Sequence, residues 1–468
     1  MEPSFEHNET DLKLLVDRFE EMLRANGSYF FDVEDFEDII DYYLDNQNIT
    51  KSRKAIDLAE AQHPGATVIL IKKARYFVLA NKPPKALSLL EEIEKIDPTN
   101  GDVYLLKGSI YSKLKKFEDA IREYNKAILY ASDIEEVYTN IAYEYENSGD
   151  YAKAIEFLSK ILDLDPENES AIFELSFCYE ITNNLEQSVE FFTNFLDNHP
   201  YNKIAWFNIG IAYNNLELFE KAIQAYEFAI AIDDTFSSAY FNLANAYANL
   251  GEYRLSIKNY KETLNYEEPQ AITYYYIGEC YEKLNRFHEA VEQYNLALKI
   301  DPEMADAWMG LGVCHDELGE QKTAVKNMER ALDFEDDNAE YWYIYGDLKY
   351  KLEDKETATK AFEKVSALDP LHPDIWLDLS DIYVESGEMK TAFEVLEEGV
   401  YQQPKNASLL YRLAGLLMKE GKQKQGLAIL SEGLELDFNK HKELFEFFPQ
   451  LEQNAEIQEL IQSYFKKK

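Results

Sequence analysis

The sequence repeats itself with a period of 34 residues. From Val33 to Lys440 the repeat runs through twelve consecutive units without an insertion or a deletion. A fixed period of this length is typical of stacked copies of one small structural element, each of which buries its apolar side only against its neighbours. When the positions of a unit are numbered from 1 to 34, position 20 is small throughout: Ser52, Ala86, Ala120, Ala154, Ser188, Ala222, Ser256, Ala290, Ala324, Ala358, Ala392 and Gly426.

Each unit carries the pattern of two helices. Apolar and small residues recur at positions 4, 7, 8 and 11 and again at 17, 20, 21, 24 and 27, which is the spacing of one helix face. In one unit these residues are Trp206, Ile209, Gly210, Tyr213, Phe219, Ala222, Ile223, Tyr226 and Ala229. Small residues at positions 8 and 20 permit close approach of the two helices, and the aromatic residues fill the space around that contact. The pattern therefore predicts an all-α chain of antiparallel helical hairpins.

This pattern resembles the tetratricopeptide repeat (TPR) family, and the resemblance covers residues 33–440, about 87% of the chain. It implies a right-handed superhelical solenoid of about twelve helix-turn-helix units, whose first helices line a concave groove. At the ends the pattern weakens, because residues 11–25 form a lone amphipathic helix and Phe448 and Pro449 depart from the repeat. We expect an N-terminal capping helix in 1–32, twelve tandem units in 33–440, and a degenerate repeat with capping helices in 441–468.

Composition limits the partners and the compartment. The formal charge of −41, from 88 acidic and 47 basic residues, opposes binding to nucleic acid or anionic lipid and favours basic partners. Solubility alone is the other explanation of that charge. The start of the chain lacks the features of a signal peptide, and no stretch approaches the roughly 18 apolar residues that a membrane span needs. We expect a cytoplasmic protein without membrane insertion.

The residues that commonly carry chemistry form no recognisable site. Cys178, Cys280 and Cys314 all stand at position 10 of their units, next to a packed position, and their spacing matches no metal site. They are predicted to be reduced thiols in the core, and we expect no metal and no cofactor. No catalytic motif occurs in a supporting context, and the repeats leave no length for an enzyme fold. We predict that the protein is not an enzyme.

An apolar surface is expected in the middle of the groove. The resemblance places the concave surface at positions 2, 5, 6, 9, 12 and 13, and position 5 is aromatic in several successive units. Asparagine is frequent beside it, and its side chain both donates and accepts, so a row of asparagines is able to pair with the backbone of an extended peptide. Packing alone is the other interpretation. The predicted peptide-binding residues are Phe173, Phe207, Asn208, Phe241, Asn242, Asn245 and Tyr275.

An acidic part of the groove is expected towards the C-terminus. The family's carboxylate clamp requires basic residues and asparagine, whereas positions 5 and 9 hold Leu105 and Ser109 in one unit, so binding of an acidic chaperone tail is not expected. Clustered carboxylates attract lysine- or arginine-rich segments, although they also solvate a surface. The predicted acidic binding residues are Asp347, Asp374, Asp378 and Asp381.

Together these patterns predict a scaffold or adaptor for protein–protein interaction. The expected partner is another protein or peptide, which presents an extended or helical segment with apolar and basic side chains to the groove. The alternative is a structural or self-associating spacer subunit that recognises through its ends or its convex face. The sequence leaves the oligomeric state open between the two.

Overall fold

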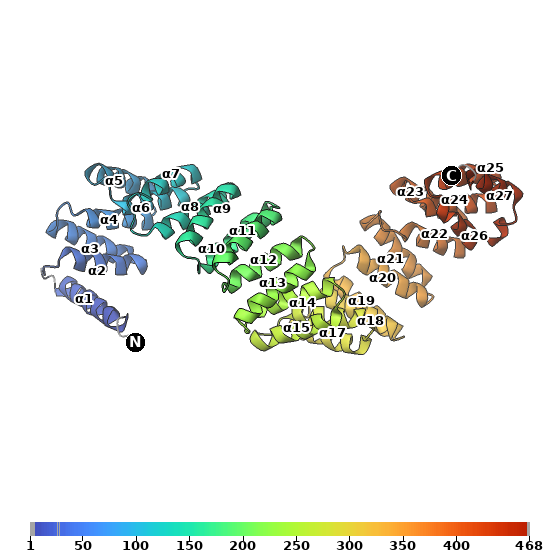
Figure 1. Cartoon of the computed structure of the whole chain (residues 1–468), viewed down its shortest axis with the longest axis horizontal. Helices are drawn as coiled ribbons and strands as arrows, with labels where there is room; N and C mark the ends of the chain where they lie inside the picture. Colours follow the sequence, from blue (N-terminus) through green and yellow to red (C-terminus); the bar gives the residue numbers. More distant parts are fainter. Residues whose placement is uncertain (1–4, 26, 28, 466–468) are drawn as a thin grey trace. The chain divides into compact units, whose positions relative to one another are not determined.

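The computed structural model describes residues 5–25, 27 and 29–465. Among these residues there are 27 α-helices and two short 3₁₀ helices, and no β-strand (Figure 1). The chain divides into two compact units, Met1–Asp234 and Thr235–Lys468, which we call unit 1 and unit 2 and describe separately. No helix in the described part of the chain is both long and apolar enough to cross a membrane.

Unit 1 is built from thirteen helices. They are α1 (Phe5–Ala25), α2 (Val33–Asp45), α3 (Ile49–Gln62), α4 (Thr67–Leu79), α5 (Pro83–Ile96), α6 (Gly101–Lys113), α7 (Phe117–Ala127), α8 (Ile134–Ser148), α9 (Tyr151–Leu164), α10 (Glu169–Ile181), α11 (Leu185–Asn198), α12 (Lys203–Asn215) and α13 (Phe219–Ile232).

Unit 2 continues with α14 to α27. They are α14 (Ser237–Asn249), α15 (Tyr253–Tyr266), α16 (Ala271–Lys283), α17 (Phe287–Ile300), α18 (Ala305–Glu317), α19 (Gln321–Phe334), α20 (Ala339–Lys351), α21 (Lys355–Leu368), α22 (Ile375–Glu385), α23 (Met389–Gln402), α24 (Ala407–Lys419), α25 (Gln423–Leu436), η1 (Phe438–Lys442), α26 (Glu443–Phe447), η2 (Pro449–Leu451) and α27 (Ala455–Phe465). In both units consecutive helices pack as hairpins, as α6 does with α7 and α18 with α19. The prediction of an all-α helical solenoid is confirmed.

The two helices of each hairpin are joined through one residue with a positive φ angle. Such residues recur every 34 positions from 47 to 421. This left-handed conformation ends a helix because it turns the backbone away from the helical path. Glycine adopts it without steric cost and asparagine tolerates it better than most residues. The twelve residues are Gln47, Asn81, Lys115, Gly149, Asn183, Glu217, Gly251, Asn285, Gly319, Glu353, Gly387 and Gly421.

Glycines in the first helices make room for aromatic rings of the second helices. A Cβ atom added to Gly210 on α12 would lie 2.5 Å from Cε1 of Tyr226 on α13. In unit 2 the ring of Tyr294 on α17 is enclosed from two sides, since a Cβ at Gly278 on α16 or at Gly310 on α18 would lie 2.7 Å or 2.5 Å from the ring. Gly210 and Gly278 at position 8, and Gly310 at position 6, are therefore glycines because a ring already fills the space that a side chain would need.

The N-terminal helix is longer than the sequence pattern indicated. The expected helix over 11–25 begins at Phe5 in the structure. Residues 6–11 are polar or charged, so they carry no apolar periodicity from which a helix is recognised. Val16, Phe19 and Met22 of α1 are buried in one cluster with residues of α2 and α3.

At the C-terminal end, the residues that depart from the repeat are packed. Phe448 is buried, and a Cβ added to Gly415 on α24 would lie 2.1 Å from its ring. Phe448 separates the end of α26 at Phe447 from the start of η2 at Pro449. The division of the chain into a cap, twelve units and a degenerate repeat stays a prediction.

The three thiols lie in the core, as predicted. Cys178, Cys280 and Cys314 are buried and form no disulfide. The Cys178 Sγ lies 3.6 Å from Glu146, and burial raises the pKa of this thiol to about 12. Because the thiolate is the reactive form, such thiols are inert at neutral pH.

Candidate functional site

The predicted apolar residues of unit 1 are exposed to very different degrees. Phe173 on α10 is 41% exposed, whereas Phe207 on α12 is only 6% exposed. The Phe207 ring packs against Tyr226, and its centroid lies 6.4 Å from that of Phe173. Asn208 is 1% exposed, and its Nδ2 donates to the Ile204 carbonyl oxygen at 2.8 Å. Of these three predicted residues, Phe173 alone has a substantial exposed surface that a partner could contact.

The predicted residues at the start of unit 2 also interact with their own repeats. Phe241 on α14 packs edge-on against Tyr260 and Tyr276. The Nδ2 of Asn242 donates to the Ser238 carbonyl at 3.0 Å, and Asn245 accepts a hydrogen bond from the Tyr260 hydroxyl. Tyr275 on α16 is buried. The side chains of Asn242 and Asn245 therefore already form hydrogen bonds within the protein, as asparagine side chains often do inside a helix.

Sequence reasoning missed two neighbours of Phe173 on α10. Phe177 and Ile181 are 49% and 55% exposed, and with Phe173 they follow an i, i+4, i+8 spacing along one face of the helix. We call these three residues the α10 stripe. Glu174 and Glu180 of the same helix are exposed. Phe177 and Ile181 stand at positions 9 and 13 of their repeat, which also belong to the expected concave surface. A search for apolar residues at these positions, in addition to position 5, would have identified them.

Three of the four predicted acidic residues meet in unit 2. A cavity of about 160 Å³ lies between α20, α21 and α22, and we call it the acidic cavity. Asp374 is exposed at the start of α22 and does not line it. The lining residues are Tyr343, Asp347, Tyr350, Phe362, Asp378, Asp381 and Ile382.

Each carboxylate that lines the acidic cavity has a polar contact with another side chain of unit 2. The Tyr343 hydroxyl donates to Asp378 at 3.0 Å. Asp347 forms an ion pair with Lys351 at 2.7 Å, and Asp381 forms one with Arg412 on α24 at 2.5 Å.

For Asp378 and Asp381, these contacts do not compensate fully for the loss of hydration on burial. Burial raises the pKa of Asp381 to about 6, although Arg412 favours its charged form, and the neighbouring Asp378 and Glu385 raise it further. Burial also raises the pKa of Asp378, which Tyr343 partly offsets. A cation that entered the cavity would relieve this repulsion, so the arrangement favours a positively charged ligand.

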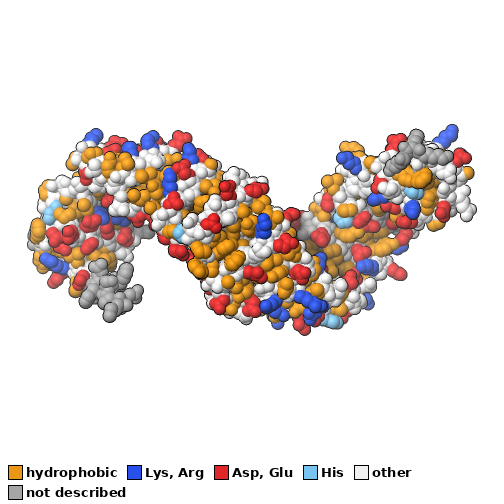
Figure 2. All heavy atoms as spheres, in the orientation of Figure 1, with side chains coloured by type: hydrophobic (Ala, Val, Ile, Leu, Met, Phe, Trp, Pro, Cys, Tyr) orange, Lys and Arg blue, Asp and Glu red, His pale blue; other side chains and the backbone are white. Residues whose placement is uncertain are grey.

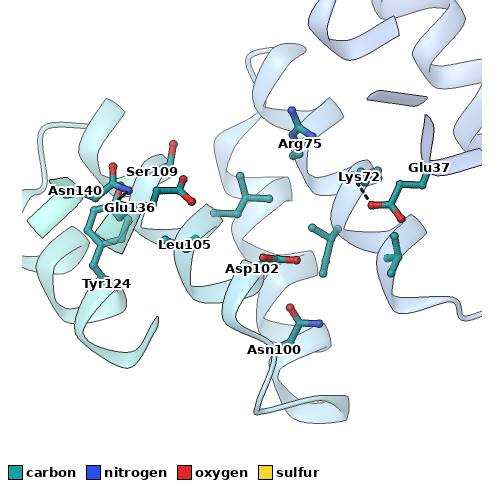
Figure 3. Close-up of a pocket in the computed structure, with 13 residues that line it drawn as sticks. Glu37, Lys72, Arg75, Asn100, Asp102, Leu105, Ser109, Tyr124, Glu136 and Asn140 are labelled. Carbon is teal, nitrogen blue, oxygen red and sulfur yellow. Dashed lines mark hydrogen bonds and ion pairs between the residues drawn. The ribbon is translucent and has the colours of Figure 1, made fainter. Parts of the chain in front are cut away.

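A second cavity, in unit 1, was not expected from the sequence. It measures about 450 Å³ and lies among the first helices α2, α4, α6 and α8, with Tyr124 of α7 at one side (Figure 3). We call it the N-terminal cavity. Its lining residues are Glu37, Val68, Ile71, Lys72, Arg75, Asn100, Asp102, Leu105, Leu106, Ser109, Tyr124, Glu136 and Asn140.

The surface around these sites is acidic, in agreement with the net charge of −41. Acidic side chains are spread over the visible face of both units, interleaved with hydrophobic ones (Figure 2). Among the described residues, no group of three or more histidine, cysteine or acidic side chains is arranged to hold a metal ion.

Comparison with family models places most of the chain in one kind of repeat. Three models, each described as tetratricopeptide repeat, match the chain, and together they cover more than half of it. The first matches residues 135–168, 204–236 and 271–304, the second 77–139 and 351–407, and the third 237–268 and 305–338. A comparison with curated proteins found no match.

Solved structures with similar folds are distant in sequence. The Cut9–Hcn1 hetero-tetramer of the APC/C is 16% identical, with 85% of this chain and 91% of that chain covered and a TM-score of 0.40. YrrB, described as a TPR protein with an unusual peptide-binding site, is 18% identical over 42% of this chain and 97% of its own, with a TM-score of 0.34. The C-terminal part of a TPR repeat-containing protein from Cytophaga hutchinsonii is 16% identical over 54% and 98%, with a TM-score of 0.43.

Proposed function

Since the chain belongs to the tetratricopeptide repeat family, we propose that it is a protein-interaction scaffold, whose groove binds a partner segment with apolar and basic side chains. The observation that carries this proposal is the α10 stripe. Phe173, Phe177 and Ile181 stay in contact with water along one face of one helix. Covering such side chains gains roughly 25 cal/mol per Å² of apolar surface, so a partner that buries the stripe is favoured.

Charge supports a basic rather than an acidic partner. Glu174 and Glu180 stand on the same helix as the stripe, and unit 2 contributes the acidic cavity. Lysine or arginine side chains of a partner would be attracted to both sites, whereas an acidic segment would be repelled. Buried apolar anchors supply much of the binding energy in protein interfaces. In this proposal the α10 stripe therefore provides most of the affinity, and the carboxylates select a basic partner.

Replacing the two most exposed residues of the stripe tests the proposal. The Phe177→Ser/Ile181→Ser variant is expected to bind a partner isolated with the wild-type chain about 30-fold more weakly or worse, the loss typical of a removed anchor. Affinity is measured by surface plasmon resonance with the purified partner. Helicity is expected to stay unchanged, because both side chains are exposed.

The matched control for this test is Ile96→Ser/Leu129→Ser. It removes two side chains of unit 1 that are even more exposed but lie outside the stripe. If the stripe variant binds as tightly as this control, the proposed groove site is wrong. Self-association that rises with concentration in light scattering, together with unaltered partner binding, would then favour the spacer-subunit alternative.

Binding of a basic segment to the acidic cavity is expected to weaken as the pH falls from 7.5 to 5.5. Asp381, with a pKa of about 6, takes up a proton in this range and loses the charge that attracts the ligand. Titration of a lysine-rich peptide at both pH values measures the change.

Two variants test whether the acidic cavity carries this pH dependence. Asp378→Asn/Asp381→Asn is expected to bind weakly at both pH values, whereas His372→Gln is expected to keep most of the pH dependence. An affinity that is equal at pH 7.5 and 5.5 in the wild-type chain would remove the acidic cavity from the proposed binding surface.

A further inference from the structure

The N-terminal cavity contains two cations, but both are already neutralised by the protein itself. Lys72 on α4 forms ion pairs with Glu37 at 2.8 Å and with Asp41 at 2.5 Å, both on α2. Arg75 forms ion pairs with Asp41 at 2.8 Å and with Asp45 at 3.4 Å. The pair between Lys72 and Glu37 is visible at one end of the cavity in Figure 3. An anionic ligand would therefore have to compete with three carboxylates for these cations.

The carboxylates on the other side of the cavity are available. Asp102 on α6 and Glu136 on α8 are exposed, and neither side chain has an ion pair within the described part of the chain. Each lies in the first turn of its helix. Both line the same cavity as Lys72 and Arg75, but in the described part of the chain the ion pairs of those two cations go to Glu37, Asp41 and Asp45 instead.

Apolar side chains line the cavity together with these charged residues. Ile71, Leu105 and Leu106 line the cavity, and Leu105 and Leu106 are partly exposed. The volume of about 450 Å³ falls within the roughly 300–1,000 Å³ range of ligand pockets and exceeds what one side chain fills. The cavity thus offers room for a charged group and an apolar group side by side.

We propose that the N-terminal cavity is a separate binding site for a basic side chain of a partner, lysine or arginine, that is followed by an apolar side chain. The ammonium or guanidinium group lies between Asp102 and Glu136, and the apolar neighbour covers Leu105 and Leu106. Charge-assisted hydrogen bonds to two carboxylates select the cation. Lysine and arginine share this chemistry, although guanidinium alone is able to pair with a carboxylate through two parallel bonds. The site adds to the α10 stripe and the acidic cavity and depends on neither.

The test uses the full chain with the other two surfaces removed by Phe177→Ser/Ile181→Ser and Asp378→Asn/Asp381→Asn. Three synthetic peptides of alternating leucine and one other residue serve as probes, in which that residue is lysine, arginine or acetyl-lysine. Calorimetric titration is expected to show binding of the lysine or the arginine peptide, and the tighter of the two identifies the preferred group. The acetyl-lysine peptide is expected to bind at least tenfold more weakly.

Adding Asp102→Asn/Glu136→Gln is expected to weaken binding of the basic peptide at least tenfold. The matched control, Glu118→Gln/Asp163→Asn, removes the same charge from exposed positions outside the cavity and is expected to leave the affinity within twofold. Equal affinity with and without Asp102→Asn/Glu136→Gln, equal affinity for the acetyl-lysine peptide, or no binding of any probe overturns the inference. None of these outcomes affects the proposal for the α10 stripe, because the stripe is absent from the tested chain.

Discussion

Replacing Gly310 with valine is expected to destabilise unit 2 by about 3 kcal/mol. The Cβ atom alone would lie 2.5 Å from Cζ of Tyr294, which is too close for any contact between carbon atoms. The Tyr294 ring has no free side to move to, because Gly278 of its own hairpin lies against the opposite side and its hydroxyl donates to Glu282 at 2.9 Å. Urea unfolding followed by circular dichroism measures the shift of the transition midpoint.

Two comparisons show whether the ring contact causes this loss. Valine has a higher helix propensity than glycine, so without the contact the substitution would slightly stabilise α18. Gly319→Ala alters a glycine with φ +77 and no neighbouring atom within 4 Å, and it is expected to cost only about 1 kcal/mol through backbone strain. If Gly310→Val unfolds no earlier than Gly319→Ala, the ring does not hold these hairpins together.

Phe207→Ala is expected to destabilise unit 1 by about 3–5 kcal/mol, whereas Phe177→Ala leaves the stability nearly unchanged. Phe207 is buried against Phe173 and Tyr226, so its removal leaves a cavity that the surrounding helices fill only in part. Phe177 is 49% exposed, so its truncation removes much less apolar burial than that of Phe207. Thermal unfolding of the two variants, compared at the same concentration and pH, measures the difference.

This pair of variants also separates a folding residue from a binding residue. Phe177→Ala is expected to weaken partner binding while the chain melts at the wild-type temperature. Phe207→Ala is expected to alter both, so a loss of binding in that variant would carry no information about the groove. Similar melting temperatures for the two variants would contradict the burial difference on which the α10 stripe is defined.

Most of the fold was predictable because one structural requirement recurs along the repeats. Position 8 is small in eleven of the twelve repeats and position 24 is a large apolar or aromatic residue throughout, a pattern that predicts helical hairpins. The contact of Gly210 with Tyr226 is its physical basis. The full length of α1 was not predictable, because a polar first turn has no apolar face to reveal it.

The candidate site was less predictable, because exposure depends on neighbouring helices. Phe173 and Phe207 hold the same position in successive units, yet only Phe173 is substantially exposed. Asn208 fits the expected ladder in sequence, but its amide bonds a carbonyl four residues earlier in its own helix. The charge of the N-terminal cavity depends on the ion pairs of Lys72 and Arg75 with carboxylates of the preceding repeat. These pairs join two repeats, so the pattern within one repeat does not predict them.

The left-handed residue between the helices of each hairpin bears on how such a chain changes in length. Every hairpin from residue 47 to 421 contains its own reversal, and consecutive reversals are 34 residues apart. When one 34-residue repeat is duplicated or deleted at equivalent points, every remaining helix keeps the residues at which it begins and ends. A gene encoding this chain can therefore gain or lose whole hairpins in a single event, and each copy carries a fresh inner surface on which a new specificity can evolve.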